Sequence, residues 1–349
     1  MNPTSNLSSD DWRRIARLLF DLGVHIREGI RADQRKHPNA DRSSIHRVTQ
    51  ADTIYEIDRV SEESLLAWFE AHWPDDYPAL VIAEGLGDEK GILFPRGFST
   101  AQITILIDPI DGTRGLMYDK RSAWMLAGAA EGSPQTSHTP TLSDLRAGAM
   151  VEIPTRRQQI SDGICGWVLE DGSYFSEAVR SHGMQDPVEP LDLFPSKARD
   201  LRHGFASFSS FFPEGRDEIQ RIESQFLQNH LPEIPSDTPL VFTDQYISSG
   251  GQLFELLSGR DRFVADVRPL VFDRLSLPRA LSCHPYDLAS LSAAFAYGCV
   301  IEDPWGQPLS APLDTTSPVA WVGYANNELA RILRPLLRET LIEQGYTPQ

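Results

Sequence analysis

The sequence is short of cysteine and of positive charge, and each shortage excludes classes of protein. Its three cysteines, Cys165, Cys283 and Cys299, are far apart and form no CxxC pair. We therefore expect a reducing compartment, without a disulfide framework or a structural zinc site. Lysine and arginine total 32 residues against 49 aspartates and glutamates, a formal net charge of -17. Such a chain repels polyanions, so binding to a nucleic acid polymer is not expected.

Long apolar runs and the common histidine and serine motifs are also absent. No stretch approaches the roughly 18 apolar residues of a membrane span, and the start, MNPTSNLSSDDWRR, forms no signal peptide. We expect a cytoplasmic protein that inserts into no membrane. There is no GxSxG motif and no HxxxH pair, which argues against a serine hydrolase and a paired-histidine metal site. We interpret His284 as a pocket-wall or structural residue.

The N-terminal half carries the patterns of a globular lobe that mixes helices with a sheet. The chain has 349 residues, 41% of them hydrophobic, which is enough for two lobes. Apolar residues recur at helical spacing over 10–28 and 49–71, with a polar loop predicted at 31–44. β-prone runs at 79–83, 102–107, 124–130 and 146–153 predict an antiparallel sheet. We expect an α+β lobe over residues 1–165.

The C-terminal half alternates between strand and helix patterns. Residues 170–195, rich in proline, glycine and acids, predict a peripheral excursion near the lobe boundary. Strands are then predicted at 203–208, 262–266 and 319–324, and helices at 216–229, 252–257, 286–296 and 327–337. This alternation predicts an α/β lobe over residues 166–349, with the functional site between the two lobes.

The segment ILIDPIDGTRG, residues 105–115, ends an apolar strand with two aspartates three positions apart. Pro109 fixes its backbone φ and Gly112 allows a φ that β-branched residues avoid, so the turn is rigid. Asp108 and Asp111 can face one concavity, and carboxylate oxygens are the ligands that magnesium prefers. The carbonyl of Ile110 can add a further oxygen ligand. A solvated Asx turn is the alternative interpretation of this pattern.

The backbone after the second aspartate suits a phosphate group. The amides of Gly112 and Thr113 are predicted to point outward at the start of the following element, and such donor pairs bind phosphate oxygens. Metal and phosphate would then meet at one place.

A metal cluster needs further acids from elsewhere in the chain, and three candidates lie at element ends. Glu84 closes the strand 79–83, where its alternative role is to keep an exposed strand end polar. Asp287 lies at the start of a predicted helix, where capping is the alternative. Asp52 lies in the first turn of the helix predicted at 49–71, where it could instead compensate the helix dipole.

The order of these motifs resembles the inositol monophosphatase superfamily, which includes the fructose-1,6-bisphosphatases and the 3'(2'),5'-bisphosphate nucleotidases. The matching segments are VTQAD at 48–52, VIAE at 81–84, IDPIDGT at 107–113, YDLAS at 286–290 and YGCVIEDPWGQPL at 297–309. The resemblance spans about residues 10–335 and leaves roughly 170–200 unmatched. It implies a layered α-β-α-β-α sandwich of the sugar-phosphatase type, combining α+β and α/β parts, and a possible homodimer.

The resemblance also implies a magnesium-dependent phosphomonoesterase acting on a small phosphorylated substrate. Two or three Mg²⁺ ions would be bound by Glu84, Asp108, the Ile110 carbonyl, Asp111 and Asp287. The catalytic residues would be Asp52, Thr113 and Glu84, with Asp52 and Thr113 flanking the attacking water and Gly112 and Thr113 binding phosphate. Clustered metals acidify bound water and neutralise the leaving alkoxide, so a covalent phosphoenzyme is not required.

The residues around the motifs bear on the substrate. Ala280 stands where the monophosphatases commonly have an acid for the inositol ring, which argues against plain inositol monophosphate. Gly85 and Tyr286 also depart from the family pattern. TRGL at 113–116 is similar to a nucleotidase segment, so Arg114 could meet a second phosphate, or could be a solvated cation. Ser249 and Gly250, in a similar glycine-bearing turn that ends in Gln252, are further predicted substrate contacts.

Two other interpretations remain open besides a 3'(2'),5'-bisphosphate nucleotidase. A haloacid-dehalogenase-type phosphatase also ends a strand with two aspartates, but it places them two residues apart, whereas Asp108 and Asp111 are three apart. A catalytically silent metal- or phosphate-binding regulator would retain the fold and the ligands without turnover.

Overall fold

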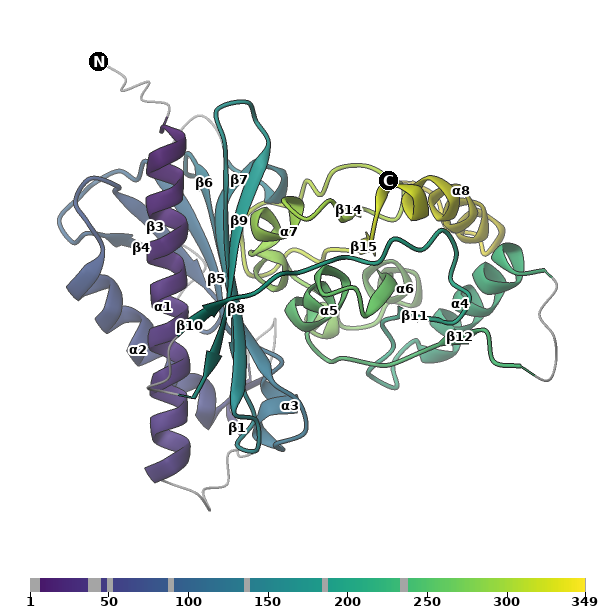
Figure 1. Cartoon of the computed structure of the whole chain (residues 1–349), viewed down its shortest axis with the longest axis horizontal. Coiled ribbons are helices and arrows are strands. Elements are labelled where there is room, and N and C mark those ends of the chain that lie inside the picture. The colour runs from purple at the N-terminus through teal and green to yellow at the C-terminus, as the bar shows by residue number, and fades with distance from the viewer. Residues whose placement is uncertain are drawn as a thin grey trace.

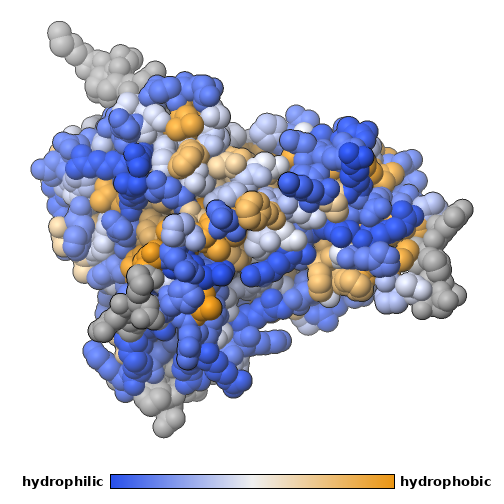
Figure 2. Space-filling model, in the orientation of Figure 1, coloured by the Kyte–Doolittle hydropathy of each residue, from blue (hydrophilic) through white to orange (hydrophobic). Residues whose placement is uncertain are grey.

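The computed structural model describes residues 7–36, 45–48, 53–86, 91–134, 139–183, 188–232 and 238–348; for 45–48 and 53–60 it describes the backbone alone. Two β-sheets, of eight and five strands, form its two lobes, with helices outside and between them (Figure 1). Polar residues dominate the face shown in Figure 2, and hydrophobic residues appear there in small groups. Within the described ranges, none of the helices combines the length and apolar character that crossing a bilayer requires.

The first lobe is a mixed sheet covered on one face by helices α1 (Ser9–Lys36) and α2 (Glu56–His72). The strand order is β10-β9-β8-β7-β6-β5-β3-β4, and only β3 and β5 are parallel. The strands are β3 (Ala79–Ala83), β4 (Ile92–Phe94), β5 (Ile103–Asp111), β6 (Ala123–Glu131), β7 (Leu145–Ile153), β8 (Ile160–Val168), β9 (Tyr174–His182) and β10 (Val188–Pro190). A separate two-stranded sheet pairs β1 (Ile45–Val48) with β2 (Thr53–Tyr55).

The second lobe is a five-stranded sheet in the order β12-β11-β13-β15-β14. Its strands are β11 (Gly204–Phe208), β12 (Val241–Phe242), β13 (Asp261–Asp266), β14 (Val300–Glu302) and β15 (Trp321–Tyr324). The helices are α3 (Thr113–Met117) in the first lobe and α4 (Arg216–His230), α5 (Ser249–Leu257), α6 (Arg268–Leu275), α7 (Leu291–Phe295) and α8 (Asn327–Glu343) in the second half. Three short 3-10 turns span Leu142–Asp144, Arg279–Leu281 and Pro285–Leu288.

Alternation along the central strands produces two hydrophobic cores. Ile105 faces the core shared with α1, whereas Leu106 faces the core shared with the second lobe. Because both faces of β5 are buried, its apolar residues run without interruption. Helices α5 and α7 lie between the sheets, and α4 and α8 cover the far side of the second sheet (Figure 1). The predicted α-β-α-β-α sandwich is confirmed.

A row of glycines lets the second lobe approach the first sheet closely. Gly128 on β6 pairs in register with Gly148 on β7, and Gly148 pairs with Gly166 on β8. A Cβ atom at Gly166 would lie 2.6 Å from the Cα of Ala293 on α7, and one at Gly128 would collide with the carbonyl oxygen of Ala289. The glycine row thus forms a trough that holds the segment 289–293, directly after Asp287.

Several predicted boundaries differ from the structure in the N-terminal half. The loop predicted at 31–44 is wrong over residues 31–36, because α1 continues to Lys36 with Ile30 and Gln34 buried on its apolar stripe. The helix predicted at 49–71 begins only at Glu56, since residues 53–55 form β2, paired with β1. The predicted antiparallel sheet is mixed, because β3 and β5 run parallel.

The stretch 170–195 is not an excursion for most of its length. Strand β9 extends the first sheet, pairing with β8 along its whole length. Its alternation is obscured because both faces of the strand carry ion-paired residues, Arg180 with Asp162 on one face and Glu177 with Arg17 of α1 on the other. The change from one sheet to the other falls between Pro190 and Gly204, later than the division expected between residues 165 and 166. The helix predicted at 286–296 is a 3-10 turn followed by the short α7.

Candidate metal centre and active site

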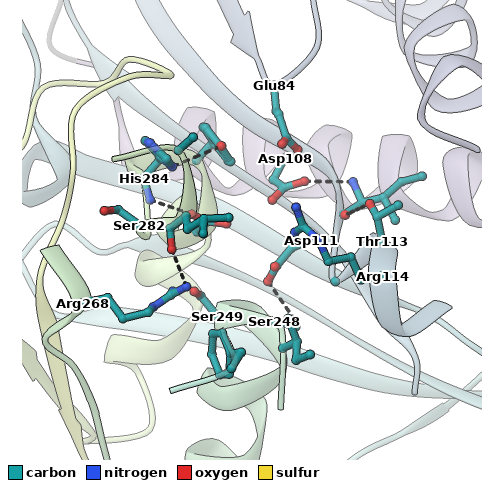
Figure 3. Close-up of a pocket in the computed structure, with 18 of the residues that line it drawn as sticks. Glu84, Asp108, Asp111, Thr113, Arg114, Ser248, Ser249, Arg268, Ser282 and His284 are labelled. Atoms are coloured by element: carbon teal, nitrogen blue, oxygen red, sulfur yellow. Dashed lines mark hydrogen bonds between the residues drawn. The ribbon is translucent and has the colours of Figure 1, made fainter. Parts of the chain in front are cut away.

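Acidic side chains from three separate parts of the chain meet in one pocket between the lobes. One carboxylate oxygen from each of Asp108, Asp111 and Asp287 lies within 4.8 Å of the others. Glu84 lines the same pocket, and Figure 3 shows it pointing toward Asp108. Asp108 and Asp111 are 1% and 6% exposed, so they are withdrawn from solvent.

The sheet explains how three of these acids become neighbours. Strands β3 and β5 are parallel, with Ala83 opposite Ile107, and the Glu84 amide donates to the Ile107 carbonyl at 3.1 Å. Parallel pairing therefore places Glu84 beside Asp108. The pairing of β5 with β6 is irregular between Asp108 and Asp111. A bulge of this kind re-aims side chains, which lets two aspartates three residues apart enter the same pocket.

Asp287 is supplied by the second half of the chain. Its carboxylate accepts a 2.6 Å hydrogen bond from the His284 amide and caps the 3-10 turn Pro285–Leu288. The same carboxylate belongs to the acidic cluster. Capping and participation in the cluster, which the sequence presented as alternatives, therefore occur together.

Asp108 and Asp111 hold their protons more tightly than acids in water, because the pKa of each is raised. Burial, reinforced by the negative charges of Glu84, Asp111 and Asp287, raises the pKa of Asp108 well above its ordinary value. Burial also raises the pKa of Asp111 to about 6, although hydrogen bonds from Gly250 and Ser248 oppose the shift. Crowded, desolvated oxygen ligands suit a hard divalent cation, whose charge favours the ionised carboxylates. The residues present therefore fit magnesium.

The start of α5 fixes the orientation of Asp111. Ser248 Oγ donates to Asp111 Oδ2 at 2.8 Å, and the Gly250 amide donates to the same oxygen at 2.6 Å. Gly250, predicted as a substrate contact, thus contacts a predicted metal ligand. Ser249 lines the pocket, and its Oγ lies 3.7 Å from the sulfur of Cys283. Substrate contact by either residue stays a prediction.

The turn after β5 contributes its predicted residues to the pocket. Gly112 has a φ of 95°, the left-handed conformation that glycine favours, and precedes α3. Thr113 Oγ1 donates to the Ile110 carbonyl at 2.8 Å. Ile110, Gly112, Thr113 and Arg114 all line the pocket. Asp52 lies outside the described residues, so its pairing with Thr113 stays a prediction.

The wall facing the acids contains residues that sequence reasoning missed. Arg268 is 5% exposed and makes a two-pronged ion pair with the fully buried Asp266. Its guanidinium lies 4.5 Å from the ring centre of Phe211, and the Arg114 guanidinium lies 5.3 Å from that of Phe212. Both phenylalanines follow β11, so no local motif links them to Arg268.

His284 lines the pocket, as predicted for a wall residue. The residue is 2% exposed, and its ring stacks on Tyr286 with the ring planes 9° apart. This stacking holds the backbone from which Asp287 projects.

No protein-family model and no curated protein sequence matches this chain, but solved structures resemble its fold. Fructose-1,6-bisphosphatase from Leishmania major superposes with a TM-score of 0.60 at 11% identity, covering 97% of this chain and 96% of its own. The extragenic suppressor protein SuhB from Bartonella henselae gives 0.57 at 13% identity, covering 93% and 99%. The Thermotoga maritima IMPase gives 0.54 at 15% identity, covering 96% and 100%. The chain has the fold of the inositol monophosphatase superfamily.

Proposed function

We propose that this protein is a magnesium-dependent phosphomonoesterase that hydrolyses a small phosphorylated metabolite by attack of water. The observation that carries the proposal is the meeting of Asp108, Asp111 and Asp287 with Glu84 in one buried pocket. Isolated acids at strand ends are commonly structural, whereas buried acids brought together from distant segments are costly unless they bind a cation. The fold shared with phosphatases supports the same function.

The proposed ligands for two or three Mg²⁺ ions are Glu84, Asp108, Asp111, Asp287 and the carbonyl of Ile110. Bound magnesium would supply an acidified water and a positive charge for the phosphoryl and leaving oxygens. The protein's own contribution is to position these ligands. Ser248 and Gly250 hold Asp111 in place, and the bulge in β5 aims it at Asp108.

The proposed roles of the neighbouring turn are binding and orientation. The amides of Gly112 and Thr113 begin α3 beside the acids and would donate to a phosphoryl oxygen. The Thr113 hydroxyl, held on Ile110, would orient the attacking water together with Asp52.

The facing wall supports a substrate with a second anionic group, such as a sugar or nucleotide bisphosphate. Arg114 lines the pocket beside Phe212, and its positive charge would meet such a group. Phe211 and Phe212 offer apolar surface to a sugar carbon skeleton or a base.

A phosphate-release screen with purified protein tests the function. We expect release that requires Mg²⁺ and stops with EDTA, when inositol phosphates, fructose 1,6-bisphosphate and adenosine 3',5'-bisphosphate are compared. Magnesium binding without release from any phosphate ester would instead identify a silent regulator. A cytoplasmic location and a homodimer complete the proposal; the three cysteines are free and buried, consistent with a reducing compartment.

A further inference from the structure

The pocket wall that faces the acids contains a buried hydroxyl group without a hydrogen-bond partner. Ser282 lines the pocket and is 8% exposed, yet its Oγ makes no hydrogen bond within the described part of the chain. In Figure 3 it lies across the pocket from Asp108 and Thr113. A buried polar atom that stays unpaired costs free energy, so it commonly serves a function in a folded protein.

The backbone on both sides of this hydroxyl is fixed by hydrogen bonds. The Ser282 amide donates to the Arg279 carbonyl at 2.9 Å. The preceding carbonyl, of Leu281, accepts from Arg268 Nη1 at 2.7 Å, and the following carbonyl accepts from the Val319 amide at 2.8 Å. The hydroxyl keeps rotation about its own Cα–Cβ bond, which has three staggered positions. It can therefore turn toward a ligand without any movement of the backbone.

The surroundings of Ser282 suit a neutral hydrogen-bonding group. Arg268, which holds the segment, is itself paired with the fully buried Asp266. Ser249 adds a second buried hydroxyl to the pocket lining, and its Oγ lies 3.7 Å from the sulfur of Cys283, a weak acceptor. A serine hydroxyl both donates and accepts, so it pairs well with another hydroxyl, whereas phosphate oxygens are better matched by cations.

We propose that Ser282 contacts the substrate and selects esters whose alcohol part carries a free hydroxyl group. The inference rests on the proposed phosphatase function and narrows its substrate class to hydroxylated esters, such as the phosphates of sugars, cyclitols or nucleosides. The phosphate lies at the acids, and Ser282 exchanges a hydrogen bond with a hydroxyl on the part of the substrate that faces the wall. An ester without that hydroxyl leaves Ser282 unpaired, and a site rejects an analogue through such a loss.

Matched pairs of esters test this selection. Each substrate of the phosphate-release screen is paired with an analogue that keeps its phosphates and lacks free hydroxyls. The pairs are inositol 1-phosphate with cyclohexyl phosphate, fructose 1,6-bisphosphate with hexane-1,6-diol bisphosphate, and adenosine 3',5'-bisphosphate with its 2'-deoxy counterpart. For a pair that the protein hydrolyses, Ser282→Ala should lower kcat/KM about tenfold for the hydroxylated ester and leave that of its analogue nearly unchanged. Equal loss on both members overturns the proposal, and so does no loss on either, which would show that the hydroxyl meets only water.

Ser207→Ala is the matched control for this substitution. Ser207 is 2% exposed and its Oγ is also unpaired among the described residues, but it lies on β11 and is not among the residues that line the acidic pocket. It should leave kcat/KM unchanged for both members of a pair. Urea unfolding gives a second readout, because Ser282→Ala removes no hydrogen bond from the free protein. Its midpoint should equal or exceed that of the unmodified protein, and a lower midpoint would identify Ser282 as a structural residue.

Binding separates a failure of this inference from a failure of the proposed function. If no ester releases phosphate, calorimetric titration of the same pairs in Mg²⁺ replaces the kinetic comparison. Binding of a hydroxylated ester that Ser282→Ala weakens about tenfold would refute the phosphatase function alone and retain the contact. Equal weakening for both members of a pair, or binding of neither, overturns the contact.

Discussion

Gly128 and Ala289 lie in direct contact, with the Ala289 carbonyl oxygen occupying the space that a side chain at Gly128 would need. Gly128 belongs to the first sheet, whereas Ala289 follows Asp287 by two residues in the second half of the chain. The position of Asp287 relative to Asp108 therefore depends on how closely a backbone can approach β6. The absence of a side chain at Gly128 thus allows the segment that carries Asp287 to approach the first sheet.

Gly128→Ala is expected to destabilise the protein by about 1–3 kcal/mol, the usual cost of overpacking a close contact. It should also weaken Mg²⁺ binding, because Asp287 is displaced from the other acids. Urea unfolding and magnesium titration measure the two effects. Gly29→Ala on α1 is the matched control, since its new methyl group would meet only Ser64 Oγ at 3.5 Å. Unchanged stability and magnesium affinity in Gly128→Ala would show that the trough is not tight.

Asp108→Asn and Asp111→Asn should each reduce phosphate release by about a thousandfold or more, because several kcal/mol of metal-ion stabilisation are lost. The fold should persist, since asparagine is nearly isosteric with aspartate. Circular dichroism and the phosphate-release assay measure both properties. Asp76→Asn, at an exposed position, serves as the control. Normal turnover in either pocket variant would contradict the proposed metal centre.

The raised pKa of Asp111 predicts how the stability of the metal-free protein depends on pH. The ordinary pKa is 3.8 and the folded value about 6, so between these values the folded state binds more protons than the unfolded state. The contribution of Asp111 to the free energy of unfolding is therefore complete below pH 3.8, and it is lost as the pH rises toward 6. The loss is roughly 1–3 kcal/mol. In EDTA, the urea midpoint should fall less steeply with rising pH in Asp111→Asn than in the unmodified protein. Identical pH profiles for the two proteins would refute the raised pKa of Asp111.

Local patterns predicted the central strands and the two aspartates that end β5, and the resemblance of the motif order added the other acids of the cluster. The unbroken apolar run before DPID predicted a strand that ends in two carboxylates. In the structure both carboxylates line the pocket. Glu84 could be predicted because it ends β3, and parallel pairing with β5 then makes it a neighbour of Asp108. Such elements carry their own periodicity and turn chemistry.

Other contacts between distant segments had no signal in the sequence. The ion pair between Asp266 and Arg268 resembles an ordinary surface pair until the packing of Phe211 over Arg268 is seen. Strand β9 escaped prediction because ion-paired residues interrupt the apolar alternation on both of its faces. The trough at Gly128 likewise depends on the backbone of Ala289, which packs against β6 from the second half of the chain. No local sequence pattern encodes that contact.

The buried pair of Asp266 and Arg268 provides a test of the pocket wall by a double-mutant cycle. Arg268→Gln should cost about 3–5 kcal/mol, because it leaves the charge of Asp266 buried without its partner. Asp266→Asn/Arg268→Gln should recover much of this loss, since both charges are then removed. Urea unfolding of the two single variants and the double variant gives the coupling energy. Additive effects would show that the two charges do not stabilise each other.

Arg114 and Phe212 line the pocket, and we expect both to contact the substrate. If Arg114 meets a second anionic group, Arg114→Gln should raise the KM for a bisphosphate about tenfold or more, because a charge-assisted contact is lost. It should leave the KM for the corresponding monophosphate nearly unchanged. Phe212→Ala should raise both KM values, since the apolar wall contacts the part common to the two substrates. Phe175→Ala, at an exposed ring on β9, controls for the loss of an aromatic side chain. Equal effects of Arg114→Gln on both substrates would place its charge near the reacting phosphate.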